Sequence, residues 1–356
     1  MKLNKLVLTL IAGSIFFVSC NNDDDTNDVP QGAYDNGVLI LNEGGFMAGN
    51  ASVSYLSEGM QLQNNIYGIN NSGNVLGDTG QDIGLNGDYA YIVLNFSNKI
   101  EVVNRYTFAH VATIEDDLIN PRYIAFEGGK AYVTNWGDGT STSDDYVAVI
   151  NLATNLVTVK IPVAEGPERI LEEDGKLYVA HKGGYGSGKT VTVINGASNT
   201  ITATITVGDL PGEIEIEDNK LYLLNEGKGS FSGGESAGSL SVINLNNNTV
   251  ASTITFPGLE HPSNLVIEDD IIYYTLGADV YSMPKNSTAL PTVKLFSTSG
   301  QDVSSIYAFA VEDNHIYVAD AGDFASAGKV YVYSLTGALE QSLTVGVIPS
   351  GFYFND

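Results

Sequence analysis

The stretch KAYVTNWGDGTSTSDDYVAVIN, residues 130–151, decides the fold because it recurs along the chain. It reads as a short apolar strand, a loop of turn residues that begins at the only Trp of the chain, and a second strand. Its core, AYVTN at 131–135, returns as LYVAH, LYLLN, IYYTL and IYVAD at 177–181, 221–225, 272–276 and 316–320. Earlier copies are YIVLN at 91–95 and LILNEG at 39–44. Seven copies that lie 41 to 52 residues apart indicate a propeller or a solenoid.

Each copy belongs to a unit of four short strands. A strand led by Pro or Gly, such as PRYIAFE (121–127), comes first, and a tight turn such as EDNK (217–220) connects it to the Tyr strand. A loop of variable length then leads to a third strand such as YVAVIN (146–151), and a fourth such as LVTVKI (156–161) ends the unit. Four alternating strands per unit are typical of a propeller blade. The aligned positions of the second strands are Leu39, Tyr91, Tyr132, Tyr178, Tyr222, Tyr273 and Tyr317.

The two ends of the repeat region complement each other. The C-terminus, PSGFYFND (349–356), is a first strand with no second strand after it, whereas the N-terminal copy starts at its second strand, 38–41. In register, Asp356 is followed almost directly by Asn36. We therefore expect one blade that both termini build together, because this arrangement leaves no open sheet edge. Residues 36–356 are predicted to form an all-β, seven-bladed β-propeller closed by pairing of the N- and C-terminal strands.

One face of this propeller is expected to carry the function. The loops between second and third strands are long and glycine-rich, such as EGKGSFSGGESAG (226–238), whereas the connections on the other face are mostly tight turns. Aromatic residues recur in these loops, and polar side chains surround the mouth of the central channel on the same face. The candidate ligand-binding residues are Phe46, Gln81, Phe96, Arg122, Trp136, Glu168, Arg169, Tyr185, Phe231, Tyr307 and Phe324. Two alternatives stay open: each aromatic residue packs within its own loop, and Arg122 with Glu168 forms an ion pair of purely structural value.

The N-terminus reads as an export signal. Lys2 and Lys5 precede an apolar run from Leu6 to Val18, which is too short for a spanning helix and is predicted to be a signal peptide over residues 1–19. Cys20 follows directly and is the only Cys, so no disulfide can form within the chain. It resembles the acylated Cys of bacterial lipoproteins, and an ordinary secretory signal is the alternative. Residues 20–35, polar and acidic, are predicted to be a flexible tether that carries the lipid anchor.

The charge excludes one class of partner. The chain has a net charge of −26, with 16 basic and 42 acidic residues. Removal of residues 1–19, which hold two of the basic residues and none of the acidic ones, leaves −28. Such a charge repels phosphate backbones, so no nucleic-acid partner is expected.

Several motifs suggest chemistry and do not support it. GGYGSGKT (183–190) fits a phosphate-binding loop, but a strand and not a helix follows it, so nucleotide binding is not expected. The position of His181 is occupied by Asn or Asp in other copies, which favours a turn-making role over metal ligation. The spacing of Asp138, Asp144 and Asp145 matches no known Ca²⁺ loop. No catalytic triad can be assembled, and we expect no catalytic residues, no resident metal and no cofactor.

YVTN at 132–135 and its repeats resemble the YVTN (YncE-like) family of seven-bladed propellers over nearly the whole mature chain. GVLILNEGGFMAGNASVSYL (37–56), GDYAYIVLNFSNKIEVVN (87–104) and INPRYIAFEGGKAYVTNW (119–136), together with the lipoprotein signal, resemble the BtuG-type surface lipoproteins of Bacteroidetes. That resemblance implies a protein at the cell surface, anchored by lipid in the outer membrane. It would bind cobalamin (vitamin B12) on one propeller face and pass it to a TonB-dependent outer-membrane transporter of the BtuB type. The alternatives are a surface binder of a glycan or of a partner protein, and, less favoured, a propeller hydrolase or lyase.

Overall fold

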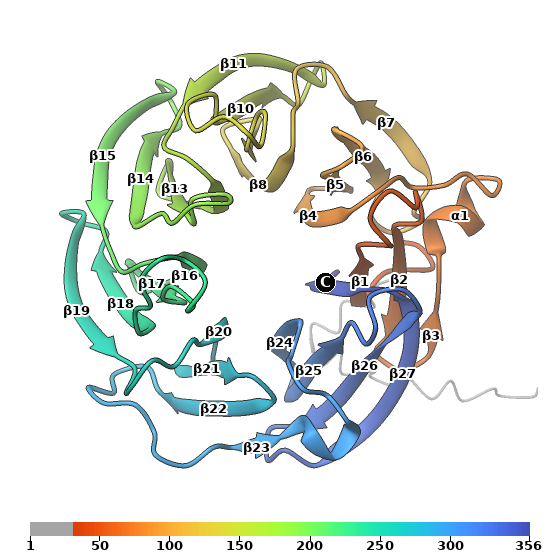
Figure 1. Cartoon of the computed structure of the whole chain (residues 1–356). Helices are drawn as coiled ribbons and strands as arrows, with labels where there is room; N and C mark the ends of the chain where they lie inside the picture. The colour runs from red at the N-terminus through yellow and green to blue at the C-terminus, as the bar shows by residue number, and fades with distance from the viewer. Residues whose placement is uncertain (1–30) are drawn as a thin grey trace, which may run out of the picture. The chain divides into compact units, whose positions relative to one another are not determined.

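The computed structural model describes residues 31–356, and these form the predicted seven-bladed β-propeller (Figure 1). Seven four-stranded antiparallel sheets surround one channel, and the first strands of successive blades contact one another in a closed cycle. The predicted signal peptide, Cys20 and most of the predicted tether lie outside the described residues. Within residues 31–356, no helix is long and apolar enough to cross a membrane.

We number the blades from the one that contains both termini. Blade 1 consists of β28 (Pro349–Phe354), β1 (Gly37–Asn42), β2 (Ser52–Ser57) and β3 (Leu62–Gln63). Blade 2 consists of β4 (Gly80–Asn86), β5 (Tyr89–Leu94), β6 (Lys99–Asn104) and β7 (His110–Ile114); blade 3 of β8 (Pro121–Glu127), β9 (Lys130–Asn135), β10 (Tyr146–Asn151) and β11 (Leu156–Pro162). Blade 4 consists of β12 (Pro167–Glu173), β13 (Lys176–His181), β14 (Thr190–Asn195) and β15 (Thr200–Thr206).

The remaining blades follow the same order. Blade 5 consists of β16 (Pro211–Glu217), β17 (Lys220–Asn225), β18 (Ser239–Asn244) and β19 (Thr249–Thr255). Blade 6 consists of β20 (Ser263–Glu268), β21 (Ile271–Leu276), β22 (Asp279–Pro284) and β23 (Phe296–Ser297); blade 7 of β24 (Ala308–Glu312), β25 (His315–Asp320), β26 (Ala327–Ser334) and β27 (Leu339–Val347). The short helix α1 (Ile66–Asn70) follows β3, and the 3₁₀ helix η1 (Thr298–Gln301) follows β23.

Closure by the two termini is confirmed. β28 pairs antiparallel with β1, so that Val38 lies opposite Phe354 and Leu41 opposite Gly351. The amide of Asn36 donates to the carbonyl of Asn355 at 3.0 Å, which continues the pairing to the last residues of the chain. The C-terminal strand is therefore the innermost strand of a blade whose other three strands come from the N-terminal end.

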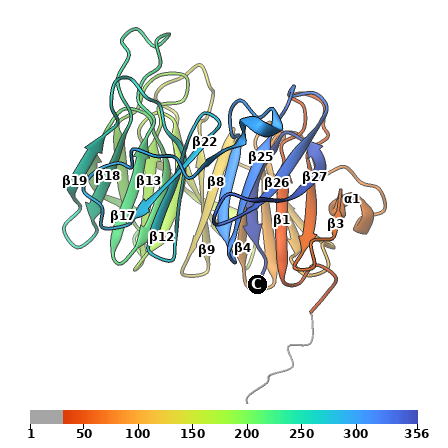
Figure 2. The ribbon, with the colours of Figure 1, turned by 90° about the horizontal axis from the view of Figure 1, so that it is seen from below.

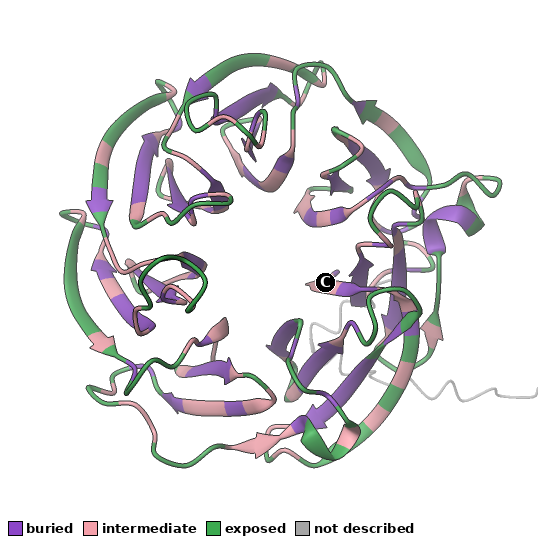
Figure 3. Ribbon diagram, in the orientation of Figure 1, coloured by how far each residue is buried: buried purple, intermediate pink, exposed green. Residues whose placement is uncertain are grey.

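The repeated Tyr packs between blades. Tyr132, Tyr178 and Tyr222 are at most 1% exposed, and the middle strands around them are buried while the outer strands face solvent (Figure 3). The hydroxyl of Tyr132 donates to the carbonyl of Gly196 in the next blade at 2.7 Å. Each of these Tyr residues thus buries a large apolar ring, and Tyr132 also satisfies its hydroxyl group across a blade junction.

The outer strands are less regular than the repeats predict. β3 and β23 contain two residues each, whereas β27 contains nine. In blade 1 the chain turns from β3 into α1, where the left-handed Asn65 accepts a hydrogen bond from the amide of Gly68. Outer strands bury the smallest share of their side chains, so their sequence is the least constrained by packing.

The second-to-third-strand loops extend from one face of the ring, which we call the loop face, and the C-terminus lies at the other, the turn face (Figure 2). Residues 31–36 also lie at the turn face. The amide of Tyr34 donates to the carbonyl of Tyr106, in the connection between β6 and β7, and the side chain of Asn355 donates to the carbonyl of Tyr34. The propeller therefore receives its N-terminal segment on the face opposite the loops.

Candidate functional site

A cavity of about 710 Å³ occupies the channel, and we call its end at the loop face the mouth. The first strands line it along its length, from Arg122 and Tyr307 at the mouth to Glu268 and Glu312 near the turn face. Six of the seven first strands carry a register irregularity near their start, as between Pro121 and Ile124 in β8. Such a bulge aims two successive side chains toward the channel, and it therefore accounts for two rings of candidate residues at the mouth.

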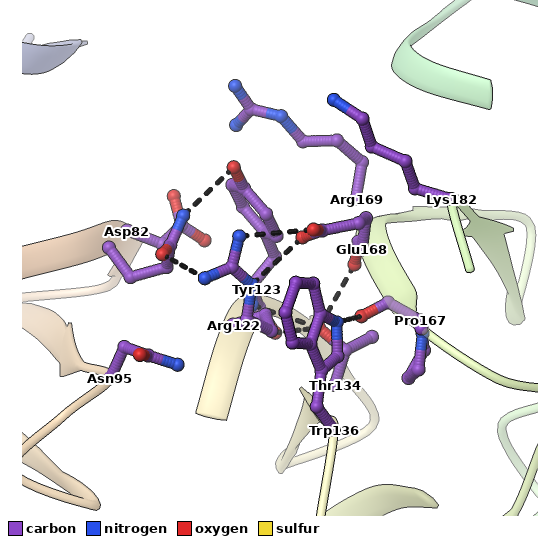
Figure 4. Close-up of polar contacts among 12 residues, drawn as sticks. Asp82, Asn95, Arg122, Tyr123, Thr134, Trp136, Pro167, Glu168, Arg169 and Lys182 are labelled. Carbon is purple, nitrogen blue, oxygen red and sulfur yellow. Dashed lines mark hydrogen bonds and ion pairs between the residues drawn. The ribbon is translucent and has the colours of Figure 1, made fainter. Parts of the chain in front are cut away.

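Arg122 organises the mouth through a bidentate ion pair (Figure 4). Its Nε and Nη2 each lie 3.0 Å from a carboxylate oxygen of Glu168 in the next blade, and its Nη1 donates to Gln81 Oε1 of the preceding blade at 2.6 Å. Burial alone would lower the pKa of Arg122, but the nearby Glu168 carboxylate raises it overall. The expected pairing of Arg122 with Glu168 is present, and it connects three blades.

Trp136 lies on the wall of this mouth. Its Nε1 donates to the carbonyl of Pro167 at 3.1 Å, and the guanidinium carbon of Arg122 lies 4.4 Å from its ring centroid. Its ring makes an edge-to-face contact with Tyr185 at 5.7 Å between centroids. The Trp stands at the start of the loop because from there its indole reaches the first strand of the next blade while one side stays accessible.

A second layer lies below this ring. Arg169 pairs with Glu213 of the next blade at 2.8 Å and stacks on Tyr123, with 4.3 Å between its guanidinium carbon and the ring centroid. Asp82 accepts hydrogen bonds from the Ile124 amide at 2.9 Å and the Tyr353 hydroxyl at 3.0 Å. Burial raises the pKa of Asp82 and that of Tyr123. This layer forms polar contacts across the junctions from blade 1 to blade 5 and closes the wall of the channel behind the mouth.

The mouth has a charged side and a neutral side. On the charged side each cation lies beside a carboxylate: Arg122 by Glu168, Arg169 by Glu213, and Lys182 by Glu226 at 2.7 Å. On the side of blades 6, 7 and 1 the walls are formed mostly by neutral residues, among them Ser263, Ala308, Tyr307, Ser350 and Gly351, and Glu43 of blade 1 adds one carboxylate. The mouth is therefore nearly balanced in charge, although the chain as a whole is strongly acidic.

The loop aromatics above the mouth are exposed, and most are paired. Phe46 contacts Phe96 at 4.7 Å between centroids, and Tyr307 contacts Phe324 at 5.6 Å. Tyr185, which is 85% exposed, completes a third pair with Trp136. Phe231, at the tip of the loop between β17 and β18, is fully exposed and makes no aromatic contact within residues 31–356. Three edge-to-face aromatic pairs at the surface, together with the exposed phenyl ring of Phe231, offer apolar contact to a ligand above the mouth.

Some residues of the mouth were missed by sequence reasoning. Glu43, Asn95, Lys182 and Glu226 occupy the place of Trp136, directly after the second strand. Asn95 donates to the Pro121 carbonyl at 3.1 Å, which matches the contact of Trp136 with Pro167, and Glu43 accepts from the Tyr307 hydroxyl at 2.9 Å. Burial raises the pKa of Glu43. The sequence did contain a pattern that could have identified Glu43 and Glu226, because LNEG occurs at both 41–44 and 224–227.

The row that precedes these residues is buried. Asn42, Asn135, Asn225 and His181 are at most 1% exposed, and the side-chain amides of Asn42 and Asn135 donate to backbone carbonyls two residues earlier. The two ring nitrogens of His181 lie 2.9 Å from the Ala164 carbonyl and 2.8 Å from Thr192 Oγ1, and burial lowers the pKa of His181 to about 4. This row fastens second strands to neighbouring segments, and it leaves the neutral imidazole of His181 no free nitrogen for a metal.

The remaining motifs fit structural roles. Thr190 begins the strand β14, and Gly188 is required there because a Cβ would lie 1.8 Å from the carbonyl oxygen of His181. Asp138 and Asp144 accept hydrogen bonds from amides of their own loop. Within residues 31–356, the only carboxylate group close enough for a shared metal is Glu217, Asp218 and Asp270, on the turn face. The loop of Asp138, Asp144 and Asp145 forms no such group.

Residues 36–310 match the family described as a domain of unknown function, DUF5074, and the chain belongs to this family. No curated protein sequence matches the chain significantly.

Solved structures resemble the chain at low sequence identity. A quinonprotein alcohol dehydrogenase-like protein from Bacteroides thetaiotaomicron matches with a TM-score of 0.66 and 14% identity, over 91% of this chain and 79% of that one. The dihydro-heme d1 dehydrogenase NirN, in complex with DHE, matches with a TM-score of 0.56 and 12% identity over 91% and 76%. Hydrazine synthase from Kuenenia stuttgartiensis matches with a TM-score of 0.54 and 17% identity over 74% and 85%. At these identities the likeness concerns the fold alone.

Proposed function

We propose that this propeller is a lipid-anchored protein of the outer-membrane surface that captures cobalamin on its loop face and passes it to a TonB-dependent transporter of the BtuB type. The observation that carries the proposal is the set of exposed aromatic pairs around a charge-balanced, hydrogen-bonding mouth. Cobalamin is large and rigid, with a flat corrin and amide groups at its edge. Apolar rings and polar groups that are already held in place suit such a ligand, because little has to be ordered on binding.

The charge of the mouth suggests how the ligand would lie. Arg122 and Arg169 are cations that could bind the cobalamin phosphate, but each is engaged by a carboxylate of the next blade. We therefore assign the mouth to the amide-bearing edge of the corrin, and we place the phosphate outward, in solvent. Arg122 would then act mainly by holding Trp136 and Gln81 in position.

The position of the N-terminal segment supports surface display. Residues 31–36 lie at the turn face, so a tether from Cys20 would not cover the aromatic loops. From Cys20 to Asn36 an extended chain spans about 50 Å. That length is comparable with the size of the propeller and would let the loop face turn toward a transporter in the same membrane.

Calorimetric titration of cyanocobalamin into the mature chain tests the proposal. We expect saturable binding, and a loss of about 1–3 kcal/mol of binding free energy for Trp136→Ala and for Tyr185→Ala, the range for an aromatic anchor. Asp174→Asn is the matched control because Asp174 is exposed in the turn between β12 and β13, on the opposite face. The control should bind as the wild type does.

The absence of any heat or spectral change with the wild type would eliminate cobalamin as the ligand. Equal losses in Trp136→Ala and Asp174→Asn would contradict the assignment of the loop face. In the first case a glycan or a partner protein becomes the better candidate, since exposed aromatic rings also stack on sugars. Titration with a panel of neutral and anionic glycans would then distinguish a glycan ligand from a partner protein.

A further inference from the structure

The turn face carries a repeated contact between successive blades. In blades 2 and 6, the residue that follows the third strand contacts the turn between the first and second strands of the preceding blade. In blade 6 this residue is Lys285, whose side chain is 3% exposed. Its Nζ lies 2.7 Å from Glu217 and 2.8 Å from Asp218 of blade 5, and 2.6 Å from Asp270 of its own blade. Three carboxylates of neighbouring turns thus hold one ammonium group.

Blade 2 uses the same position for a second cation. Arg105 follows β6, and its Nε donates to Asn355 Oδ1 of blade 1 at 2.6 Å. Its Nη2 donates to the main-chain oxygen of Asp356, the last residue of the chain. The position therefore places a positive group on the turn of the preceding blade at two junctions.

Blade 1 places a carboxylate at this position. Gly37 pairs with Ser57 in blade 1 as Ile271 pairs with Pro284 in blade 6, so Glu58 occupies the place of Lys285. The turn that it faces, in blade 7, has the sequence Glu312–Asp313, which matches Glu217–Asp218 of blade 5. Glu58, which is exposed, thus places a carboxylate where Lys285 and Arg105 place a cation in blades 6 and 2.

A pocket of about 310 Å³ lies at this junction. Glu58, Asp313 and Asp356 supply its carboxylates, while Tyr317, Phe354 and Leu56 supply apolar and aromatic walls. None of the ion pairs formed within residues 31–356 involves Glu58 or Asp313. The pocket combines carboxylates with aromatic rings, and this is the chemistry that recognises ammonium groups.

The negative charge at this junction raises the pKa of neighbouring groups. Burial raises the pKa of Glu312, and Glu268, Asp313 and Asp356 raise it further. Burial also raises the pKa of Tyr317 to about 12, with added contributions from Asp313 and Glu312. The other titratable group of the pocket is His315, whose Nε2 lies 3.3 Å from Glu340 and whose Nδ1 is buried with no hydrogen-bond partner.

We propose that the junction of blades 7 and 1 is a binding pocket for a primary alkylammonium group, which takes the place that the Lys285 ammonium takes between blades 5 and 6. The carboxylates of Glu58 and Asp313 would accept its N–H groups, and the rings of Tyr317 and Phe354 would contact its alkyl chain. The ammonium can belong to a free amine or to a lysine side chain of a partner protein. The pocket lies on the turn face and does not depend on the ligand of the loop face.

Calorimetric titration of 1,5-diaminopentane into the mature chain at low salt tests this proposal. We expect saturable binding of the diamine and none of 1-pentanol, its neutral counterpart. Glu58→Gln should weaken binding about tenfold, because one charged hydrogen bond is lost. Glu58→Lys should abolish it, because the new side chain supplies an ammonium as Lys285 does. Asp88→Lys is the matched control: it makes the same charge change at an exposed residue of the same face, in the turn between β4 and β5.

Three outcomes would overturn the proposal. They are the absence of saturable diamine binding, equal losses in Glu58→Lys and Asp88→Lys, and displacement of the diamine by stoichiometric Ca²⁺, which would make the carboxylates a metal site. A parallel titration with N-acetyl-lysine methylamide distinguishes the sources of the ammonium. Binding of both amines supports the pocket and indicates a lysine side chain, and binding of the diamine alone supports it and indicates a free amine.

Discussion

Loss of the Arg122 side chain should destabilise the whole propeller. Its guanidinium forms two contacts of 3.0 Å with Glu168, and Glu168 is only 6% exposed. Arg122→Ala would leave this carboxylate buried without a counter-ion, which costs about 3–5 kcal/mol of unfolding free energy. Arg122→Lys should lose less, because it keeps the charge but not the planar fork that matches a carboxylate.

A double-mutant cycle isolates the pair. Arg122→Ala combined with Glu168→Ala removes both charges, so the double variant should be about 1–3 kcal/mol more stable than the sum of the single losses predicts. Urea unfolding followed by far-ultraviolet circular dichroism measures the free energies. The fluorescence of Trp136, the only Trp of the chain, reports separately on the mouth, because the Arg122 guanidinium stacks on its ring.

Two results would refute this reasoning. One is a loss of unfolding free energy of no more than about 0.5 kcal/mol for Arg122→Ala, which is the range of ordinary surface substitutions. The other is an additive cycle, in which the double variant loses as much as both single variants together. Either would mean that the pair is solvated and that Trp136 is held by other contacts.

Three further predictions concern closure, location and pH. Deletion of residues 349–356 should lower the melting temperature and promote aggregation, because it removes the innermost strand of blade 1; unchanged stability would contradict closure by the termini. Cys20→Ala should move the protein from the membrane to the soluble fraction of fractionated cells, and a variant that stays with the membrane would contradict the lipid anchor. Burial, and then the neighbouring Glu213, raise the pKa of Glu215 to about 8, above the ordinary value of a glutamate. Folding therefore takes up a proton, so stability should fall as the pH rises toward 8, and Glu215→Gln should flatten this dependence in thermal unfolding; an unchanged slope would count against it.

The fold could be predicted because its signals repeat. The row of buried Tyr residues and the complementary ends each follow from a constraint that acts on every blade: the packing of adjacent sheets, and the closure of the ring. The two-residue strands β3 and β23 and the helix α1 could not be predicted, because each occurs at one exposed outer edge. No periodic pattern constrains such an edge.

The mouth could be predicted only as a set of residues. Positions in register placed Gln81, Arg122 and Glu168 on one ring, and the structure brings these three together. Their partners depend on bulges near the starts of the first strands, which shift the register there. A shift of one residue leaves no mark on composition or periodicity, so the ion pairs of the second layer could not be assigned.

The distribution of charge bears on what the loop face can bind. The chain carries 26 excess negative charges, and a mouth lined by unpaired carboxylates would repel anionic ligands. In this mouth, however, each of three carboxylates is paired with a cation of the preceding blade. Because these pairs between blades neutralise the cations that an anionic ligand would need, amides, hydroxyls and aromatic rings remain to contact a ligand. Buried ion pairs also resist rearrangement, since separating them exposes an uncompensated charge in the channel. We therefore infer that the loop face selects its ligand by shape, apolar contact and neutral hydrogen bonds, and that phosphorylated or sulfated analogues should compete poorly at the mouth.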